Sequence, residues 1–303
     1  VAPGVDAWQV SLNLLMGVVV LSGLLILATY WWINKYVLTD ARFYDPNERK
    51  AMKKEKPKMS LKESFMYLLR SKYVGCIAVL VMAYGISINL VEVTWKSQLK
   101  LQYPSPSEYS AFMGKFSATT GVVTIFMMLF VGGNVVRRLG WRFGAMITPV
   151  VLLVSGGLFF SFIIFRSGWS GIVGMLGTTP LMMAVLFGMF QNIASKSAKY
   201  SLFDPTKEMA YIPLDQESKV KGKAAIDVVG ARLGKSGGAL VQFALIAILG
   251  NVAAITPYVA GILFLIIGGW LLAANSLSKQ FNAVNEEKEA EKKAPVEAKA
   301  VEE

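Results

Sequence analysis

Long uncharged and mostly apolar blocks alternate with polar segments along this chain. The uncharged blocks cover residues 7–34, 73–91, 116–136, 143–165, 167–195 and 236–278. A bilayer core about 30 Å thick needs about 20 apolar residues in a helix to cross it. Each block is long enough for one crossing, and the last, interrupted by turn residues at 251–257, is long enough for two. The period-two alternation of a transmembrane barrel is absent from the sequence.

The pattern therefore predicts an all-α polytopic membrane protein with seven spans. They are placed at about residues 10–33, 73–95, 109–136, 143–165, 170–195, 224–249 and 255–276. Composition agrees with this interpretation: 54% of the 303 residues are hydrophobic, mean hydropathy is +0.48 and only 17% are charged. A soluble protein would carry nearer a quarter of charged residues.

Charge in the connecting segments predicts the topology. Residues 34–72 contain eleven Lys/Arg against five Asp/Glu, which places this loop in the cytoplasm by the positive-inside rule. The basic segments 137–142 and 196–223 then fall on the same side, and the sparsely charged loops on the other. The net charge of +11 is thus explained by cytoplasmic loops, and no nucleic-acid partner is predicted.

Two further polar segments carry local signals. Ser60 followed by Glu63 forms a capping-box pattern, which predicts that an amphipathic surface helix begins there. The tail from Lys279 to Glu303 is rich in Glu, Lys and Ala, and it is predicted to be disordered. The chain does not begin with Met, lacks a signal peptide of the usual form and has an odd number of predicted spans. These features together predict a C-terminal piece of a longer protein.

Several kinds of chemistry are excluded by composition. The chain has no histidine and one cysteine, Cys76, so a zinc site, histidine acid–base catalysis and an intrachain disulfide are not expected. No metal or cofactor is predicted. Gly234-Lys235-Ser236 resembles the end of a P-loop, but three residues separate Gly230 from Gly234 where that motif needs four, and no strand precedes it. Glycines at 230, 234 and 238 instead predict a face for close helix packing.

The first candidate binding group lies near the end of the second span. Asn89, Glu92 and Lys96 are spaced three and four apart, so they share one helix face. Ionisable residues inside spans usually face a bundle interior or an aqueous cavity. The alternative is a charge pair that only marks the outer end of the span.

The second and third groups are basic. Lys196 and Lys199 follow the fifth span and suit a phosphate ligand, or else anchor a helix end at the cytoplasmic surface. Asp227, Arg232 and Lys235 lie in the sixth span. Arg232 and Lys235 can share one face of it, but the three residues cannot all do so. They are candidates for an anion site, and structural pairing of Asp227 and Arg232 with other helices is the alternative. Transport of an anion accounts for all three groups.

Residues 133–142 resemble the cytoplasmic loop signature of major facilitator transporters, although Arg137 occupies the position of its acidic residue. Residues 89–96 and 199–215 resemble signatures of the nucleotide transporter family of obligate intracellular bacteria and plastids, the non-mitochondrial ATP/ADP translocases. The resemblance covers residues 8–278. It implies a twelve-span, major-facilitator-like helix bundle, of which this chain would hold the sixth to twelfth spans.

The division implied by the resemblance has four parts. Residues 1–33 would hold the last span of the N-terminal half, 34–72 the central cytoplasmic loop, 73–278 the six-span C-terminal half, and 279–303 the disordered cytoplasmic tail. The partners expected are ATP and ADP, the lipid bilayer and the N-terminal half of the same protein. The expected location is the inner membrane of a bacterium, with the plastid inner envelope as the alternative.

The resemblance also implies exchange of ATP for ADP without hydrolysis. Glu92 matches a glutamate of the family motif, and Lys196 or Lys199 would match a family lysine. Lys196 is predicted to be the deeper of the two, and residues 203–213 are assigned to gating. The alternatives are a proton-coupled nucleotide symporter, a nucleotide-binding membrane enzyme and a channel.

Overall fold

A computed structural model describes residues 7–39 and 60–302. The side chains of Leu61, Ala231, Lys235 and residues 287–302 lie outside this description, as does the stretch 40–59 of the predicted central loop. Helices account for nearly all of the described residues, which contain no strand. The protein is therefore an all-α polytopic membrane protein, as predicted. Its described residues divide into two units, one with the first helix and residues 105–111 and the other with the remainder, and each is described by itself.

The first helix, α1 (Ala7–Trp32), continues into a short π-helix, η1 (Ile33–Val37). Its apolar side chains are exposed on every side, which suits a helix surrounded by lipid or by other apolar helices. Near its C-terminal end, the Lys35 ammonium lies 4.7 Å from the centroid of the Trp31 ring. Aromatic and basic residues together are typical of a helix end at the membrane–water interface.

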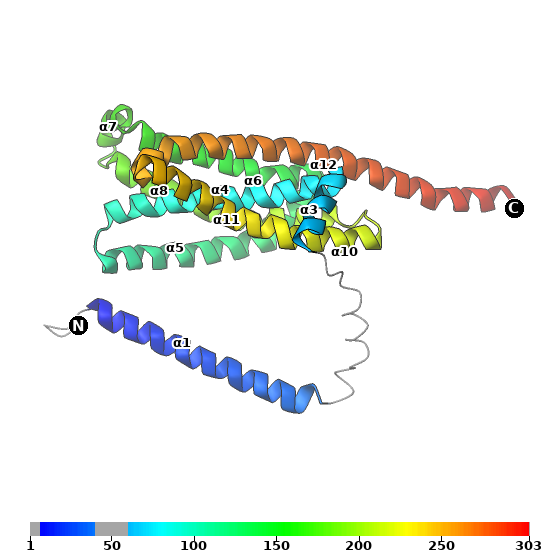
Figure 1. The fold of residues 1–303 in the computed structure, drawn as a ribbon, viewed down its shortest axis with the longest axis horizontal. Helices are drawn as coiled ribbons and strands as arrows, with labels where there is room; N and C mark the ends of the chain where they lie inside the picture. Colours follow the sequence, from blue (N-terminus) through cyan, green and yellow to red (C-terminus); the bar gives the residue numbers. More distant parts are fainter. Residues whose placement is uncertain (1–6, 40–59, 303) are drawn as a thin grey trace. The chain divides into compact units, whose positions relative to one another are not determined.

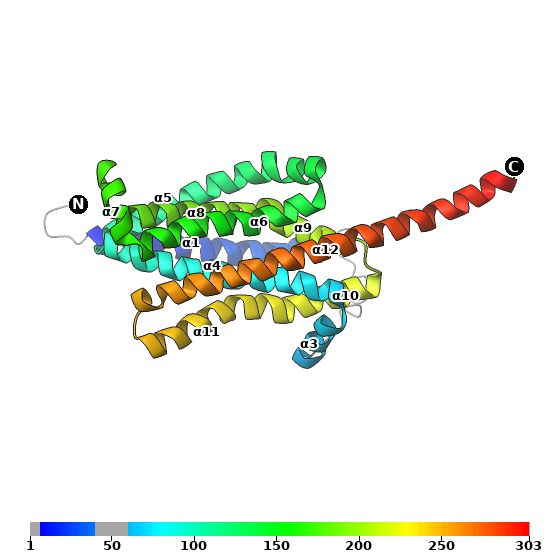
Figure 2. The ribbon, with the colours of Figure 1, turned by 90° about the horizontal axis from the view of Figure 1, so that it is seen from above.

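The second unit is a bundle of antiparallel helices (Figures 1 and 2). Its elements are α3 (Leu61–Arg70), α4 (Lys72–Gln102), α5 (Pro106–Phe126) from residue 112 on, η2 (Met127–Gly132), α6 (Gly133–Ile164), α7 (Arg166–Met175), α8 (Pro180–Ala198), η3 (Lys199–Phe203), α9 (Asp204–Ala210), α10 (Gln216–Ala225), η4 (Ile226–Gly230), α11 (Ala231–Leu249) and α12 (Val252–Glu302). Helix α4 packs against α8, α11 and α12, and α6 packs against α8 and α12.

Five helices of the described residues are long and apolar enough to cross a membrane, or six if α7 and α8 form one broken span. One of the five is the 59-residue stretch Pro106–Ile164. This stretch reverses direction at Gly140, whose φ of +84° is a conformation that favours glycine. Its two arms coincide with two of the predicted spans, which accounts for the difference between six helices and seven predicted crossings.

The predicted fifth span differs from the structure. Residues 170–195 were expected to form one helix kinked near Pro180, but α7 and α8 meet at 92°. Gly177, with φ +69°, ends the α7 turn, the Thr179 side chain caps α8, and Pro180 occupies the first turn of α8, where its missing N–H costs nothing. The helix predicted for residues 170–195 is therefore broken between Met175 and Pro180, and α7 is a separate short helix.

The stretch after α8 was predicted to be a loop, but it is helical as far as Ala210. Pro205 does not break it because it lies in the first turn of α9, where no intrahelical N–H bond is lost. The helix is anchored along its length. The Trp141 indole donates to the Thr206 carbonyl at 2.8 Å, and the Tyr73 hydroxyl donates to the Ala210 carbonyl at 2.7 Å.

Two glycine contacts fix the distance between neighbouring helices. A Cβ atom added to Gly85 of α4 would lie 2.8 Å from the backbone of Gly234 in α11, which confirms the predicted packing role of that glycine. A Cβ atom on Gly188 of α8 would lie 2.2 Å from the buried Trp95 ring. The Trp95 indole also donates to the Val185 carbonyl at 2.9 Å, which fixes α4 against α8.

The predicted amphipathic helix is present as α3. Ser60 accepts from the Glu63 N–H at 3.2 Å, and the Glu63 carboxylate accepts from the Ser60 N–H at 2.8 Å, so the capping box is confirmed. These bonds hold the pKa of the Glu63 carboxyl below its usual value. The tail differs from its prediction, because α12 continues as a helix to Glu302. Glu, Lys and Ala are strong helix formers, and this explains how a sequence too polar to be buried continues a helix.

Candidate binding cavity within the bundle

A cavity of about 410 Å³ lies between α4, the η3–α9 segment and η4. Its volume is within the range of small-molecule sites. It is lined by Val81, Tyr84, Gly85, Ile88, Asn89, Glu92, Lys199, Phe203, Asp204, Lys207, Ile226 and Asp227. An apolar wall and five charged side chains therefore share one space inside a membrane bundle.

Glu92, which lines the cavity, pairs with two lysines. Its carboxylate lies 2.8 Å from the Lys96 ammonium and 3.7 Å from the Lys196 ammonium. The spacing of Glu92 and Lys96 on one turn of α4 is the one predicted from the sequence. Lys196 reaches the same carboxylate from α8, and its ammonium also lies 5.2 Å from the centroid of the Phe116 ring. One carboxylate thus holds two lysines from two different helices.

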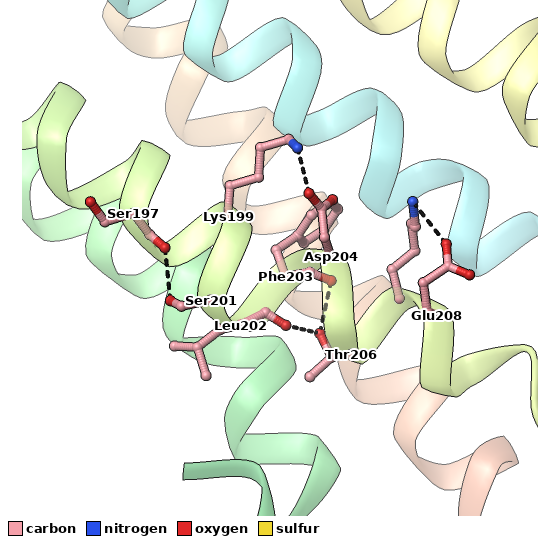
Figure 3. A network of polar contacts seen from close by, with 9 residues as sticks. Ser197, Lys199, Ser201, Leu202, Phe203, Asp204, Thr206 and Glu208 are labelled. Carbon is pink, nitrogen blue, oxygen red and sulfur yellow. Dashed lines mark hydrogen bonds and ion pairs between the residues drawn. The ribbon is translucent and has the colours of Figure 1, made fainter. Parts of the chain in front are cut away.

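The π-helical segment η3 produces the second charge pair. The Asp204 N–H donates to the Lys199 carbonyl, a bond between residues five apart. This closure places the two side chains on the same side of the helix, whereas a regular α-helix would turn them well apart. The Lys199 ammonium donates to the Asp204 carboxylate at 2.6 Å (Figure 3). The pair is half-buried, with about a quarter of the Lys199 side chain exposed.

Aromatic rings surround Lys199. Its ammonium lies 4.3 Å from the centroid of the Tyr200 ring and 5.8 Å from that of the Tyr84 ring. Tyr84 stacks on Phe203 with centroids 5.4 Å apart, and the buried Trp270 ring packs edge-on against this stack. A cation placed against ring faces is stabilised without a counter-ion. Lys199 can therefore release Asp204 without being left unsupported.

A third charge cluster lies beyond Asp204. The Glu208 carboxylate is 3.3 Å from the Lys207 ammonium and also accepts from the Lys223 ammonium. Figure 3 shows Lys199, Asp204 and Glu208 following one another along the η3–α9 segment. Lys207 lines the cavity while its carboxylate partner does not. Lysines and carboxylates thus follow one another from the C-terminal end of α8 to α10.

The candidates on the last polar segment are only partly brought together. Asp227, in η4, lines the cavity. Arg232 is exposed on α11 and is not among the lining residues, and the Lys235 side chain lies outside the described part of the structure. Asn89 lines the cavity but is engaged as well: its side-chain oxygen accepts from the Gln242 amide of α11 at 3.1 Å.

Sequence reasoning found part of this site. Four of its candidates line the cavity, and two more reach it through Glu92: Asn89, Glu92, Lys199 and Asp227, then Lys96 and Lys196. Of the two lysines that it weighed, Lys199 lines the cavity and Lys196 does not. The greater depth of Lys196 and the gating role of residues 203–213 stay predictions, and Phe203 and Asp204 of that stretch line the cavity. Extending the stripe of Asn89 and Glu92 backward by helical spacing reaches Tyr84. Asp204 required the π-turn, which no pattern indicated.

No metal site accompanies these groups in the described residues. Across 7–39 and 60–302, no group of three or more Cys, Asp or Glu side chains lies close enough to hold a metal ion. The chemistry that the cavity offers is charge recognition by lysines that carboxylates already hold. Such an arrangement suits an anionic ligand that competes with the carboxylates.

Comparison with known proteins gives a consistent result. The chain is 61% identical over 292 residues to ADP,ATP carrier protein 1 of Chlamydia pneumoniae, covering 96% of this chain and 57% of that protein. It is 56% identical over 290 residues to ADP,ATP carrier protein 1, chloroplastic, of Arabidopsis thaliana, covering 96% and 45%. It is 48% identical over 271 residues to ADP,ATP carrier protein 1 of Rickettsia prowazekii, covering 88% and 54%.

The chain spans about half the length of these curated relatives. No solved structure matches it. The profile of a single protein family, described as TLC ATP/ADP transporter, matches residues 1–281, which include every helix that lines the cavity. The chain belongs to the TLC ATP/ADP transporter family.

Proposed function

We propose that this chain forms the C-terminal part of a carrier that exchanges ATP for ADP across a membrane by alternating access, without hydrolysis. The names of its relatives, ADP,ATP carrier proteins from bacteria and plants, support the substrates. The observation that carries the proposal is the cavity in the bundle, where Asp204 holds Lys199 and where the lining residue Glu92 also holds Lys196 of α8.

The proposed mechanism is an exchange of counter-ions. Nucleotide phosphates take the place of Asp204 at Lys199 and of Glu92 at Lys196, because an ammonium binds phosphate as a point charge. When the nucleotide dissociates, Asp204 and Glu92 pair again with Lys199 and Lys196. Alternating access requires that the substrate binds near the bilayer midplane, between two halves of the carrier. The second half would be the N-terminal part of the same protein.

The proposal includes a division of the chain. Residues 1–33 form the last span of the N-terminal half, 34–72 the central cytoplasmic loop, 73–278 a major-facilitator-like six-span half, and 279–303 a cytoplasmic tail. Lys96, Asp227, Arg232 and Lys235 contribute further charge near the path of the substrate. The proposed location is the inner membrane of a bacterium, supported by chlamydial and rickettsial relatives, with the plastid envelope as the alternative.

Counterflow tests this function. Proteoliposomes containing the full-length carrier are loaded with ADP, with ATP, with another nucleotide or with buffer, and uptake of labelled ATP is followed with and without a proton gradient. We expect uptake only with ADP or ATP inside, and no release of inorganic phosphate. Uptake into buffer-loaded vesicles that depends on the proton gradient would instead establish symport. Phosphate release in step with uptake would establish a membrane enzyme.

A further inference from the structure

A second cavity, which shares no lining residue with the first, lies beside the amphipathic helix α3. One side of α3 is fixed to the bundle. Ser64 and Leu68 are buried, and a Cβ atom on Gly75 of α4 would lie 2.8 Å from the Leu68 carbonyl oxygen. The capping box at Ser60 fixes where the helix begins. The helix is therefore held rigidly at the start of α4.

An exposed flank of α3, between its buried side and the stripe of Lys62, Met66 and Arg70, is apolar. Phe65 is 51% exposed, Met66 43% and Leu69 67%. Figure 2 shows α3 lying across the direction of the long helices and projecting from the bundle at the end where α4 begins. An amphipathic helix in this orientation beside membrane spans places its apolar face in the boundary between headgroups and acyl chains.

The cavity beside this apolar face is basic. It has a volume of about 540 Å³ and is lined by Lys62, Glu63, Met66, Tyr67, Arg70 and Lys221. Lys62, Met66 and Arg70 recur every fourth residue, so they form one stripe of α3, and Lys221 faces it from α10. Three cations therefore meet at a cavity that one amphipathic helix closes on one side.

The two acidic groups near this cavity are already engaged. Glu63 accepts from the Ser60 N–H, and Glu217 accepts from the Lys221 ammonium. Within residues 7–39 and 60–302, neither Lys62 nor Arg70 forms an ion pair. The cavity thus offers one ammonium and one guanidinium without a protein counter-ion, next to exposed Phe65 and Leu69.

We propose that this cavity binds the headgroup of an anionic phospholipid from the leaflet that faces α3. The phosphodiester accepts hydrogen bonds from Arg70 and Lys62, which together present the fork and the point charge that phosphate binds. The acyl chains continue past Met66 and along Phe65 and Leu69 into the bilayer. A basic site next to spans on the predicted cytoplasmic side is where anionic lipids are expected. The site does not depend on the nucleotide function.

Native mass spectrometry of the full-length protein in detergent tests this lipid site. Protein is titrated with phosphatidylglycerol or with phosphatidylcholine, and the bound lipids are counted. In the double variant Lys62→Gln, Arg70→Gln we expect phosphatidylglycerol affinity to fall at least about tenfold, with phosphatidylcholine unchanged. The matched control, Lys100→Gln with Arg138→Gln, removes the same charge at exposed positions away from α3 and should retain the lipid.

Two further arms make the result decisive. The variant Lys62→Arg, Arg70→Lys keeps both charges and should restore phosphatidylglycerol binding, which a folding defect would not allow. Inorganic phosphate at the lipid concentration should not displace the lipid. Equal phosphatidylglycerol binding by wild type and the double Gln variant would overturn the proposal. Displacement by phosphate alone would overturn it as well, since it would identify a free-anion site.

Discussion

Lys199 is the residue whose surroundings most clearly fit a carrier. Its ammonium donates to Asp204 at 2.6 Å and lies against the rings of Tyr200 and Tyr84. The carboxylate neutralises the lysine in this state, and the rings support it when the carboxylate is displaced. If Asp204 competes with phosphate for Lys199, removing the lysine should weaken ATP binding and removing the carboxylate should strengthen it.

We expect Lys199→Gln to raise the ATP concentration for half-maximal exchange at least about tenfold, because a charge-assisted hydrogen bond to phosphate is lost. Labelled ATP uptake into ADP-loaded proteoliposomes measures this value. Lys100→Gln removes a charge from the exposed last turn of α4 and is the matched control, for which no change is expected. An unchanged value for Lys199→Gln would remove Lys199 from the site.

We expect Asp204→Asn to act in the opposite direction. The partly exposed pair is worth about 0.2–1 kcal/mol, so freeing Lys199 should lower the half-maximal concentration by a factor of about 1.4 to 5. Uptake into vesicles without internal nucleotide should also rise, because the empty site no longer recovers its counter-ion. The same assay measures both quantities. If Asp204→Asn weakens ATP as Lys199→Gln does, Asp204 supports the lysine and does not compete with the substrate.

At the scale of elements, the π-helical segments η2, η3 and η4 are the least regular parts of the spans. η2 and η3 touch: a Cβ atom on Gly132 would lie 2.1 Å from the Ser201 carbonyl oxygen. The Thr124 and Ser197 hydroxyls, which precede this contact on the same two helices, are 3.0 Å apart. A π-turn shifts the register of a helix by one residue, so these segments decide which side chains face the cavity.

The contact of Gly132 with the Ser201 backbone gives a prediction for stability. Gly132→Ala places a methyl group against backbone, and we expect it to lower the thermal unfolding midpoint by about 3–10 °C in detergent. Gly133→Ala is the adjacent control, because a Cβ atom there meets nothing within 4 Å. It should leave the midpoint unchanged or raise it slightly through helix propensity. Equal midpoints for the two variants would contradict the close contact of η2 with η3.

Hydropathy predicted the long helices because lipid requires about 20 apolar residues per crossing, whatever the details of packing. It could not predict the 92° bend before Pro180, which depends on the conformation of Gly177 and on the capping of α8 by the Thr179 side chain. Charge spacing predicted the pair of Glu92 with Lys96, since both lie on one regular helix. It missed the pair of Lys199 with Asp204, because residues five apart meet only where the helix is irregular.

At the scale of the molecule, one half-length chain carries a cavity with its own set of counter-ions. Glu92 and Asp204 hold Lys196 and Lys199 from within the same bundle. Lys199, which lines the cavity, and Lys196, which pairs with the lining residue Glu92, therefore both have protein counter-ions. A second, basic cavity beside α3 faces the predicted interface. The two proposals thus assign nucleotide binding and lipid binding to separate parts of the bundle.

The central claim is that nucleotide binds in the cavity between α4, η3 and η4. Cys76 is the only cysteine of the chain, so Cys76→Ala provides a thiol-free background for this chain. Ile88→Cys then places a reporter on the cavity wall, and Val93→Cys places one on the exposed side of α4.

The rate of alkylation by a charged maleimide is measured with and without ATP in the full-length protein, whose cysteines outside this chain are also replaced by alanine. At ATP concentrations about ten times Kd, we expect the Ile88→Cys rate to fall about tenfold and the Val93→Cys rate to stay the same. An Ile88→Cys rate that ATP does not change, in a protein that still binds ATP, would contradict the account.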